Sequence, residues 1–141
     1  MYFKPLLLPL LAQIALTFLV MLVMYQRRIG EMKTKRIDPQ RAKTRSAVHG
    51  VLPDSESASN NYSNLLESPL LFYVAILLTL ILMVQDSILV ALAWTYVASR
   101  YIHPFIHITD NRVMHRFSVF IFSGFVLLAM WVRLGWIIIQ A

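Results

Sequence analysis

The chain has 141 residues, of which 58% are hydrophobic and 14% are charged, and its formal net charge is +6. It contains no cysteine, which excludes disulfide bonds, protein thiol nucleophiles and thiolate metal sites. Any thiol chemistry must therefore use a thiol that a ligand supplies. The apolar content leaves no room for a second, soluble domain.

Four apolar segments are each long enough to cross a bilayer, which takes about 20 helical residues. They cover residues 6–25, 65–84, 88–108 and 117–139. They lack strict apolar/polar alternation, so they fit helices rather than the strands of a barrel. The sequence predicts an all-α integral membrane protein: a four-helix transmembrane bundle that forms one domain over residues 1–141.

Basic side chains concentrate in the first connection, between Arg27 and Arg45, and in the third, at Arg112 and Arg116. The positive-inside rule places these connections in the cytoplasm and both termini outside. Attraction to anionic lipid headgroups explains the basic loop better than a nucleic-acid partner does. Arg133, near the outer end of the last segment, is expected to snorkel to the interface.

The first connection is the only long one, and it has two halves. Its basic half is expected to prolong the first helix until Asp38–Pro39 interrupts it. Residues 50–63 are polar and rich in turn formers, which predicts a mobile loop. The other two connections are short, so consecutive helices should be antiparallel neighbours.

Polar residues lie at the start of the second span. Asn60, Asn64 and Glu67 follow the i, i+4, i+7 spacing of one helical stripe, if the helix begins before Asn60. An ionised carboxylate at this depth must face the bundle interior, a partner or water. The alternative is that Asn64-x-x-Glu67 caps a helix start. Spacing alone leaves both interpretations open.

The third span is expected to have a small face and a polar face. Ala91, Thr95 and Ala98 form a row of small residues, which favours close helix packing. The opposite face carries three ionisable side chains: Arg100, His103 and His107. Imidazoles at i and i+4 can bind a metal. No carboxylate accompanies the pair at ligand spacing, so we predict hydrogen-bonded histidines and no metal.

All four predicted helices bring polar or cationic groups to the cytoplasmic rim. These groups are Arg27 and Arg28, Asn64 and Glu67, His107 and Arg112, and His115 and Arg116. Such a rim suits an anionic, water-soluble ligand that meets a lipophile arriving from the bilayer. The alternative function is that of a non-catalytic membrane protein whose rim binds lipid headgroups, or of an accessory subunit of a membrane complex.

Two motifs resemble those of a known family. Asn64-Leu-Leu-Glu67-Ser-Pro69, followed at a distance by Arg100-Tyr101 and by Asn111-Arg112, resembles the MAPEG family (membrane-associated proteins in eicosanoid and glutathione metabolism), particularly its bacterial branch. The resemblance covers the second to fourth spans. It implies a homotrimer that holds glutathione as co-substrate between neighbouring subunits at the cytosolic rim, with no metal.

The resemblance also implies roles for individual residues. Asn64 and Glu67 would contact the tripeptide backbone and its ammonium group, Tyr101 would donate a hydrogen bond to a carboxylate, and Arg112 would pair with the thiolate as the catalytic residue. The thiolate would attack a lipophilic electrophile or reduce a lipid hydroperoxide, with membrane lipids as partners and no nucleic acid. His107, at the same rim, is a further candidate ligand contact.

The chain departs from the family pattern at three positions. Asn60 stands where catalytic members usually have an arginine, Phe105 stands where they tend to have a tyrosine, and Pro69 follows Glu67 by two residues rather than three. The cations of the first connection are candidates to replace the missing arginine: Arg27, Arg28 or Arg45.

Overall fold

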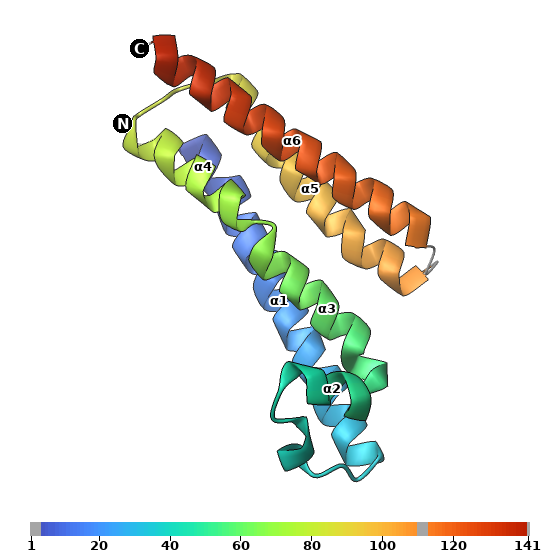
Figure 1. Cartoon of the computed structure of the whole chain (residues 1–141). Helices are drawn as coiled ribbons and strands as arrows, with labels where there is room; N and C mark the ends of the chain where they lie inside the picture. Colours follow the sequence, from blue (N-terminus) through green and yellow to red (C-terminus); the bar gives the residue numbers. More distant parts are fainter. Residues whose placement is uncertain (1–3, 110–112, 141) are drawn as a thin grey trace. The chain divides into compact units, whose positions relative to one another are not determined.

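The computed structural model describes residues 4–109 and 113–140, without the side chains of residues 4, 42, 45, 48, 49, 57, 104–109 and 113–116. Within this range all regular structure is helical, which confirms the all-α prediction (Figure 1). In chain order the elements are α1 (Lys4–Thr34), the short 3-10 helix η1 (Pro39–Ala42), α2 (Arg45–Val51), α3 (Pro53–Glu67), α4 (Leu70–Ile81), α5 (Ser87–Thr109) and α6 (Val113–Gln140).

Three stretches of the described chain are long and apolar enough to cross a membrane: Pro5–Thr34, Pro53–Ile81 and Phe117–Gln140. The second stretch runs through α3 and α4, which a break at Ser68–Pro69 separates. The predicted third span also forms one helix, the 23-residue α5.

The helices form two compact units, which are described separately. The larger unit comprises residues 1–14 and 68–141, and the smaller unit comprises residues 15–67. That the chain forms a single domain stays a prediction.

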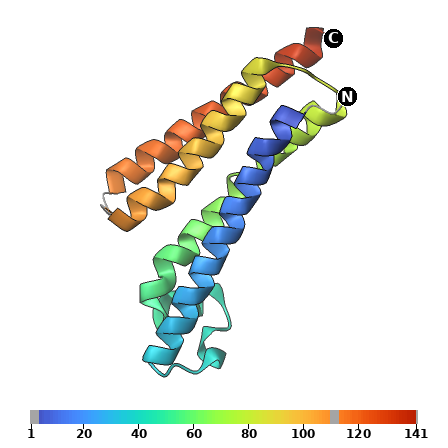
Figure 2. The ribbon, with the colours of Figure 1, turned by 180° about the vertical axis from the view of Figure 1, so that it is seen from behind.

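In the larger unit the first part of α1 and helices α4, α5 and α6 bury a common apolar core. α5 and α6 lie side by side along their length in both views (Figures 1 and 2). The rings of Phe72 and Tyr96 stack in this core with centroids 4.6 Å apart, and both side chains are fully buried. Leu6 of α1 and Leu134 of α6 belong to the same cluster.

One end of the larger unit is closed by the turn between α4 and α5. α4 ends in a tight turn in which Val84 N–H donates to the Thr79 carbonyl and Met83 takes the left-handed conformation (φ 52°). Asp86 then begins α5 as a helix cap, because its Oδ1 accepts a hydrogen bond from Leu89 N–H at 2.9 Å. Its other oxygen pairs with Arg133 of α6.

In the smaller unit α3 lies antiparallel to the second part of α1, and Figure 2 shows the two helices side by side. Leu16 and Val20 of α1 pack with Leu65 of α3 in a small apolar cluster. The buried positions of this segment recur every three or four residues, as on one helical face: Leu52, Ser55, Ala58, Asn61 and Leu65.

The prediction of a mobile loop over residues 50–63 is wrong, because α3 begins at Pro53. Its contact face uses small side chains, Ser55 and Ala58, that pack on α1 without adding much local hydrophobicity. The prolonged first helix is confirmed: α1 reaches Thr34. Asp38 follows and caps η1, where its Oδ1 accepts the Gln40 N–H at 2.9 Å.

Candidate functional site

The start of α3 decides between the two interpretations of the Asn64–Glu67 motif. Because α3 runs from Pro53 to Glu67, Asn64 lies inside the helix and Glu67 is its last residue. The motif therefore does not cap a helix start, and Asn60, Asn64 and Glu67 share a helical stripe. At ~100° per residue, Glu67 lies about 160° around the helix from Leu65, which packs on α1. The Glu67 side chain is exposed.

Arg28 is the cation of α1 that contacts α3. Its Nη2 lies 3.3 Å from the hydroxyl of Ser59, to which it donates a hydrogen bond. Its Nε is buried and has no hydrogen-bond partner within the described part of the chain. Arg28 thus bonds near the middle of α3, about five residues before Asn64 and outside the Asn60–Asn64–Glu67 stripe.

A buried carboxylate joins the last turns of α1 to the beginning of α3. Glu31 Oε1 accepts the backbone N–H of Asp54 at 3.0 Å, and Oε2 accepts that of Ser55 at 2.8 Å. Lys35 Nζ lies 2.7 Å from Glu31 Oε1 and 2.6 Å from Asp54 Oδ2. The two acidic side chains raise the pKa of Lys35 above its ordinary value, with Asp54 the larger cause. No local sequence pattern points to Glu31, because its partners lie 23 and 24 residues away.

Tyr101 lies in the larger unit, on α5. Its hydroxyl donates a hydrogen bond to the carbonyl of Ala12 in α1 at 2.7 Å, and 37% of the residue is exposed. In this structure Tyr101 therefore links two helices. A ligand carboxylate at this place would compete with the Ala12 carbonyl for the same hydroxyl.

Arg100 and His103 are buried in the larger unit, with 1% and 5% of their surface exposed. The guanidinium carbon of Arg100 lies 5.9 Å from the centroid of the Phe120 ring on α6, within the range of a cation–π contact. Ionisable side chains inside an apolar span are costly and point to a functional site. The sequence placed both residues on a polar face, but it did not rank them among the ligand contacts.

The small face of α5 is exposed in the described part of the chain. Ala91, Thr95 and Ala98 are exposed, whereas Arg100 and His103 on the opposite face are buried. Among the described residues the predicted packing seam is therefore not seen, since α5 turns Arg100 and His103 inward.

An apolar groove of about 370 Å³ runs between α5 and α6. Its wall consists of Thr95, Ala98, Ser99, Ile102, Ser118, Val119 and Phe122. The hydroxyls of Thr95 and Ser99 donate to carbonyls of their own helix, at 2.8 and 2.6 Å, and so do not make the wall polar. The groove suits hydrocarbon groups.

The site predicted from the sequence is divided among parts of the structure. Arg28, Asn64 and Glu67 lie in the smaller unit, and Tyr101 lies in the larger one. Arg112 lies outside the described residues, as does the side chain of His107. That these residues form one site remains a prediction. No group of three or more histidine, cysteine, aspartate or glutamate side chains suited to a metal occurs in the described part of the chain.

Comparison with known proteins identifies one family. The model of the MAPEG family matches residues 6–136, which is nearly the whole chain. No curated protein and no solved structure matches the chain. The match extends from the start of the first predicted span to residue 136 within the last, and it includes both motifs on which the resemblance depends. The chain belongs to the MAPEG family.

Proposed function

We propose that this membrane protein binds glutathione, or another small anionic thiol, at the cytoplasmic rim and uses it on lipophilic substrates. The reaction is transfer of the thiol to an electrophile or reduction of a hydroperoxide. The family match over residues 6–136 carries the proposal. The absence of cysteine from the chain agrees with a reaction in which the ligand brings the sulfur.

Each proposed contact recognises one charged or polar group of the ligand. The Glu67 carboxylate attracts the ligand's ammonium, the Asn64 amide bonds to its peptide groups, and Tyr101 donates to a carboxylate. Arg112 pairs with the sulfur and is the proposed catalytic residue, because a nearby cation lowers the pKa of a thiol from about 8.5 and so increases the reactive thiolate. The remaining proposed contacts are Arg28 and His107.

Arg100 adds a positive charge to this set. Since it is almost completely buried beside the Phe120 ring, the low dielectric around it strengthens its attraction for an anion. A soluble anion with two carboxylates needs several such donors to offset its loss of hydration.

The lipophilic partner has a matching surface in the groove between α5 and α6. Ile102, which lines the groove, follows Tyr101 in the chain. A hydrocarbon chain in this groove would replace lipid contacts on the exposed face of the two helices. This arrangement supports substrates that partition into the bilayer.

We further propose a homotrimer in the inner membrane, with both termini outside and the basic connection in the cytoplasm. The exposed small row of α5, made by Ala91, Thr95 and Ala98, supports contacts between subunits, because small side chains allow close helix approach in lipid.

The test is thiolate binding by the purified protein. Glutathione added to protein in lipid nanodiscs should produce an ultraviolet thiolate band and raise the thermal midpoint. The Arg112→Ala variant should lose the band, whereas Lys33→Ala, which removes an exposed cation of the first connection, should keep it. Absence of both band and thermal shift at millimolar glutathione would contradict the proposal.

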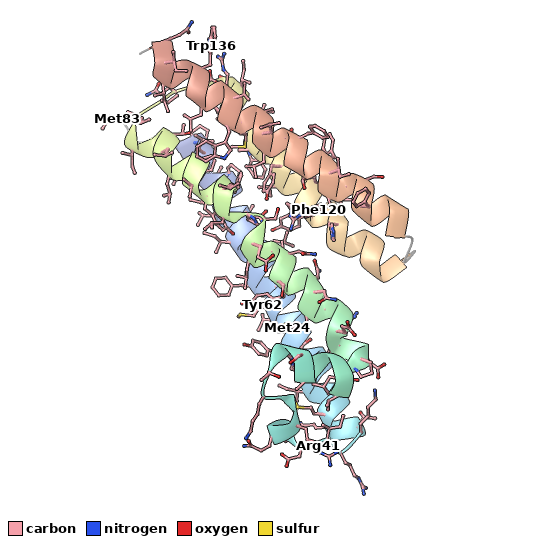
Figure 3. The ribbon with its side chains drawn as sticks, in the orientation of Figure 1. Met24, Arg41, Tyr62, Met83, Phe120 and Trp136 are labelled. Carbon is pink, nitrogen blue, oxygen red and sulfur yellow. The ribbon has the colours of Figure 1, made fainter. Side chains whose placement is uncertain are left out.

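A second candidate function, binding of anionic lipid headgroups, has its own observation. The acidic side chains near the end of α1 are used internally: Glu31 and Asp54 bond to Lys35, and Asp38 caps η1. The nearby cations are exposed and form no ion pair with described residues: Arg27, Lys33, Arg36, Arg41 and Lys43. Arg41 extends from the end of the smaller unit (Figure 3).

Nanodiscs of two compositions test this candidate. Anionic lipid should raise the thermal midpoint of unfolding relative to zwitterionic lipid. The triple variant Arg36→Gln, Arg41→Gln and Lys43→Gln should have the same midpoint in both lipids. An equal midpoint in both lipids would exclude this function.

A further inference from the structure

The cap that Glu31 places on α3 links the end of α1 to the helix that carries two proposed ligand contacts. The residue is 7% exposed, and each of its carboxylate oxygens accepts one backbone N–H from the first turn of α3. These N–H groups have no partner inside their own helix, because the first four amides of any α-helix lack one. The negative charge also lies at the positive end of the α3 dipole.

Two bonds to successive amides fix α3 more tightly than one bond would. A slip of α3 by one residue moves it ~1.5 Å along its axis and rotates each side chain by ~100°. Either change would carry the amides of Asp54 and Ser55 away from the two oxygens. Lys35 balances the charge, since it bonds to both Glu31 and Asp54.

Two other contacts between α1 and α3 are less directional than the Glu31 cap. Arg28 reaches Ser59 through one bond of 3.3 Å, made by a flexible side chain. The cluster of Leu16, Val20 and Leu65 is apolar, and apolar contacts are not directional. The buried charge at Glu31, with its partner Lys35, is therefore a directional element of the α1–α3 contact.

We infer that Glu31 is a positioning residue: it sets the register and rotation of α3 against α1, and thereby the direction in which Asn64 and Glu67 face. The effect on register stands by itself, whereas the effect on the ligand rests on the proposed function. Asn64 and Glu67 lie nine and twelve residues beyond Ser55, or roughly 14 and 18 Å along the helix.

Cross-linking tests the register directly, because the chain has no cysteine of its own. Cysteines at Val20 and Leu65, which pack together, should join readily through a short thiol cross-linker. The matched pair places the second cysteine at Leu66, one residue away and exposed, and should join slowly. Glu31→Gln, which keeps the shape but removes the charge, should reduce the ratio of the two rates about tenfold.

An unchanged ratio in Glu31→Gln would overturn the inference. If Glu31→Gln does not fold, Glu31→Asp replaces it, since it keeps the charge but is too short to reach both amides. The ratio of cross-linking rates in Glu31→Asp should be lower than in the parent protein but higher than expected for a random register of α3 against α1. A ratio equal to that of the parent would also overturn the inference.

Ligand binding separates positioning from general stabilisation. Glu31→Gln should weaken glutathione binding about tenfold. Asp86→Asn, which breaks an ion pair in the other unit, should lower the thermal midpoint but keep the glutathione affinity. If both variants lose affinity in proportion to their thermal midpoints, Glu31 is only structural. If the parent protein binds no glutathione, the proposed function fails, and the cross-linking ratio still decides the role of Glu31.

Discussion

Asp86 Oδ2 lies 2.6 Å from Nη2 and 3.2 Å from Nε of Arg133, so one carboxylate oxygen accepts both guanidinium donors. The Asp86 side chain is 12% exposed and that of Arg133 is 35% exposed. Because Asp86 also caps α5, a single residue fastens the α4–α5 turn to α6 and begins the next helix. The sequence predicts that Arg133 snorkels to the membrane interface. In the structure it has a protein partner, Asp86, 47 residues away.

Replacement of either member of this pair should destabilise the larger unit. We expect Asp86→Asn to lower the free energy of unfolding by about 1 kcal/mol, since the pair is partly exposed. Arg133→Gln should cost a similar amount, and the double variant should cost less than the sum of the two. Denaturation of all four proteins in the same detergent measures the coupling energy; strictly additive losses would contradict the ion pair.

The same pair should make stability depend on pH. The hydrogen bond from Arg133 is the main cause that holds the pKa of Asp86 below its ordinary value of 3.8, and the Leu89 N–H assists. A carboxyl group with a lowered folded-state pKa stabilises the protein above its unfolded pKa, and this contribution disappears as the pH falls through the folded value.

The parent protein should therefore exceed Asp86→Asn in stability from about pH 5 upward, and the difference should vanish in stronger acid. Unfolding curves of both proteins between pH 3 and pH 7 measure it. A difference that stays constant over this range would contradict the lowered pKa.

The hydroxyl of Tyr101 should contribute to stability and to ligand affinity separately. Tyr101→Phe removes the bond to the Ala12 carbonyl and should cost about 1 kcal/mol of unfolding free energy. Tyr25→Phe is the matched control, because Tyr25 is exposed at the end of the first span. Calorimetry with glutathione should show a further loss of affinity for Tyr101→Phe alone; equal affinities would remove Tyr101 from the proposed contacts.

Arg100 should require its guanidinium group and not merely its charge. Arg100→Lys keeps the cation but loses the planar group over Phe120 and its several fixed donors, so glutathione affinity should fall about tenfold. Arg41→Lys, at an exposed position of the smaller unit, should bind as the parent does. Titration calorimetry on the three proteins makes the comparison, and unchanged affinity in Arg100→Lys would exclude a role of the guanidinium group beyond its charge.

The apolar segments were sufficient to predict helices, because a long hydrocarbon-compatible run has few other ways to satisfy its backbone. The sequence from Pro53 to Ser63 was misleading, since its helix depends on partners outside itself. Ser55 and Ala58 gain their burial from α1, and the cap comes from Glu31, more than twenty residues earlier. No local pattern contains that contact.

The candidate site was only partly accessible to sequence reasoning. The spacing of Asn60, Asn64 and Glu67 predicted a stripe, and the early start of α3 supports it. Their relation to Tyr101 and Arg112 depends on how segments far apart in the chain assemble, which spacing does not specify. The sequence also does not specify which face of α5 turns inward. The row of small residues and the row that contains Arg100 both have helical spacing, so either could have faced the core.

The contact face of α1 changes from hydrocarbon to charge within two turns, from Leu16, Val20 and Met24 to Arg28 and Glu31. The apolar length from Leu6 to Met24 is about 19 residues, or roughly 28 Å. The helix is thus matched to a membrane of ordinary thickness. A thicker, sterol-rich bilayer would draw the guanidinium group of Arg28 toward acyl chains, whereas a thinner bilayer would be accommodated by tilt of the helix. Hydrophobic mismatch would therefore act directly on the hairpin that α1 and α3 form.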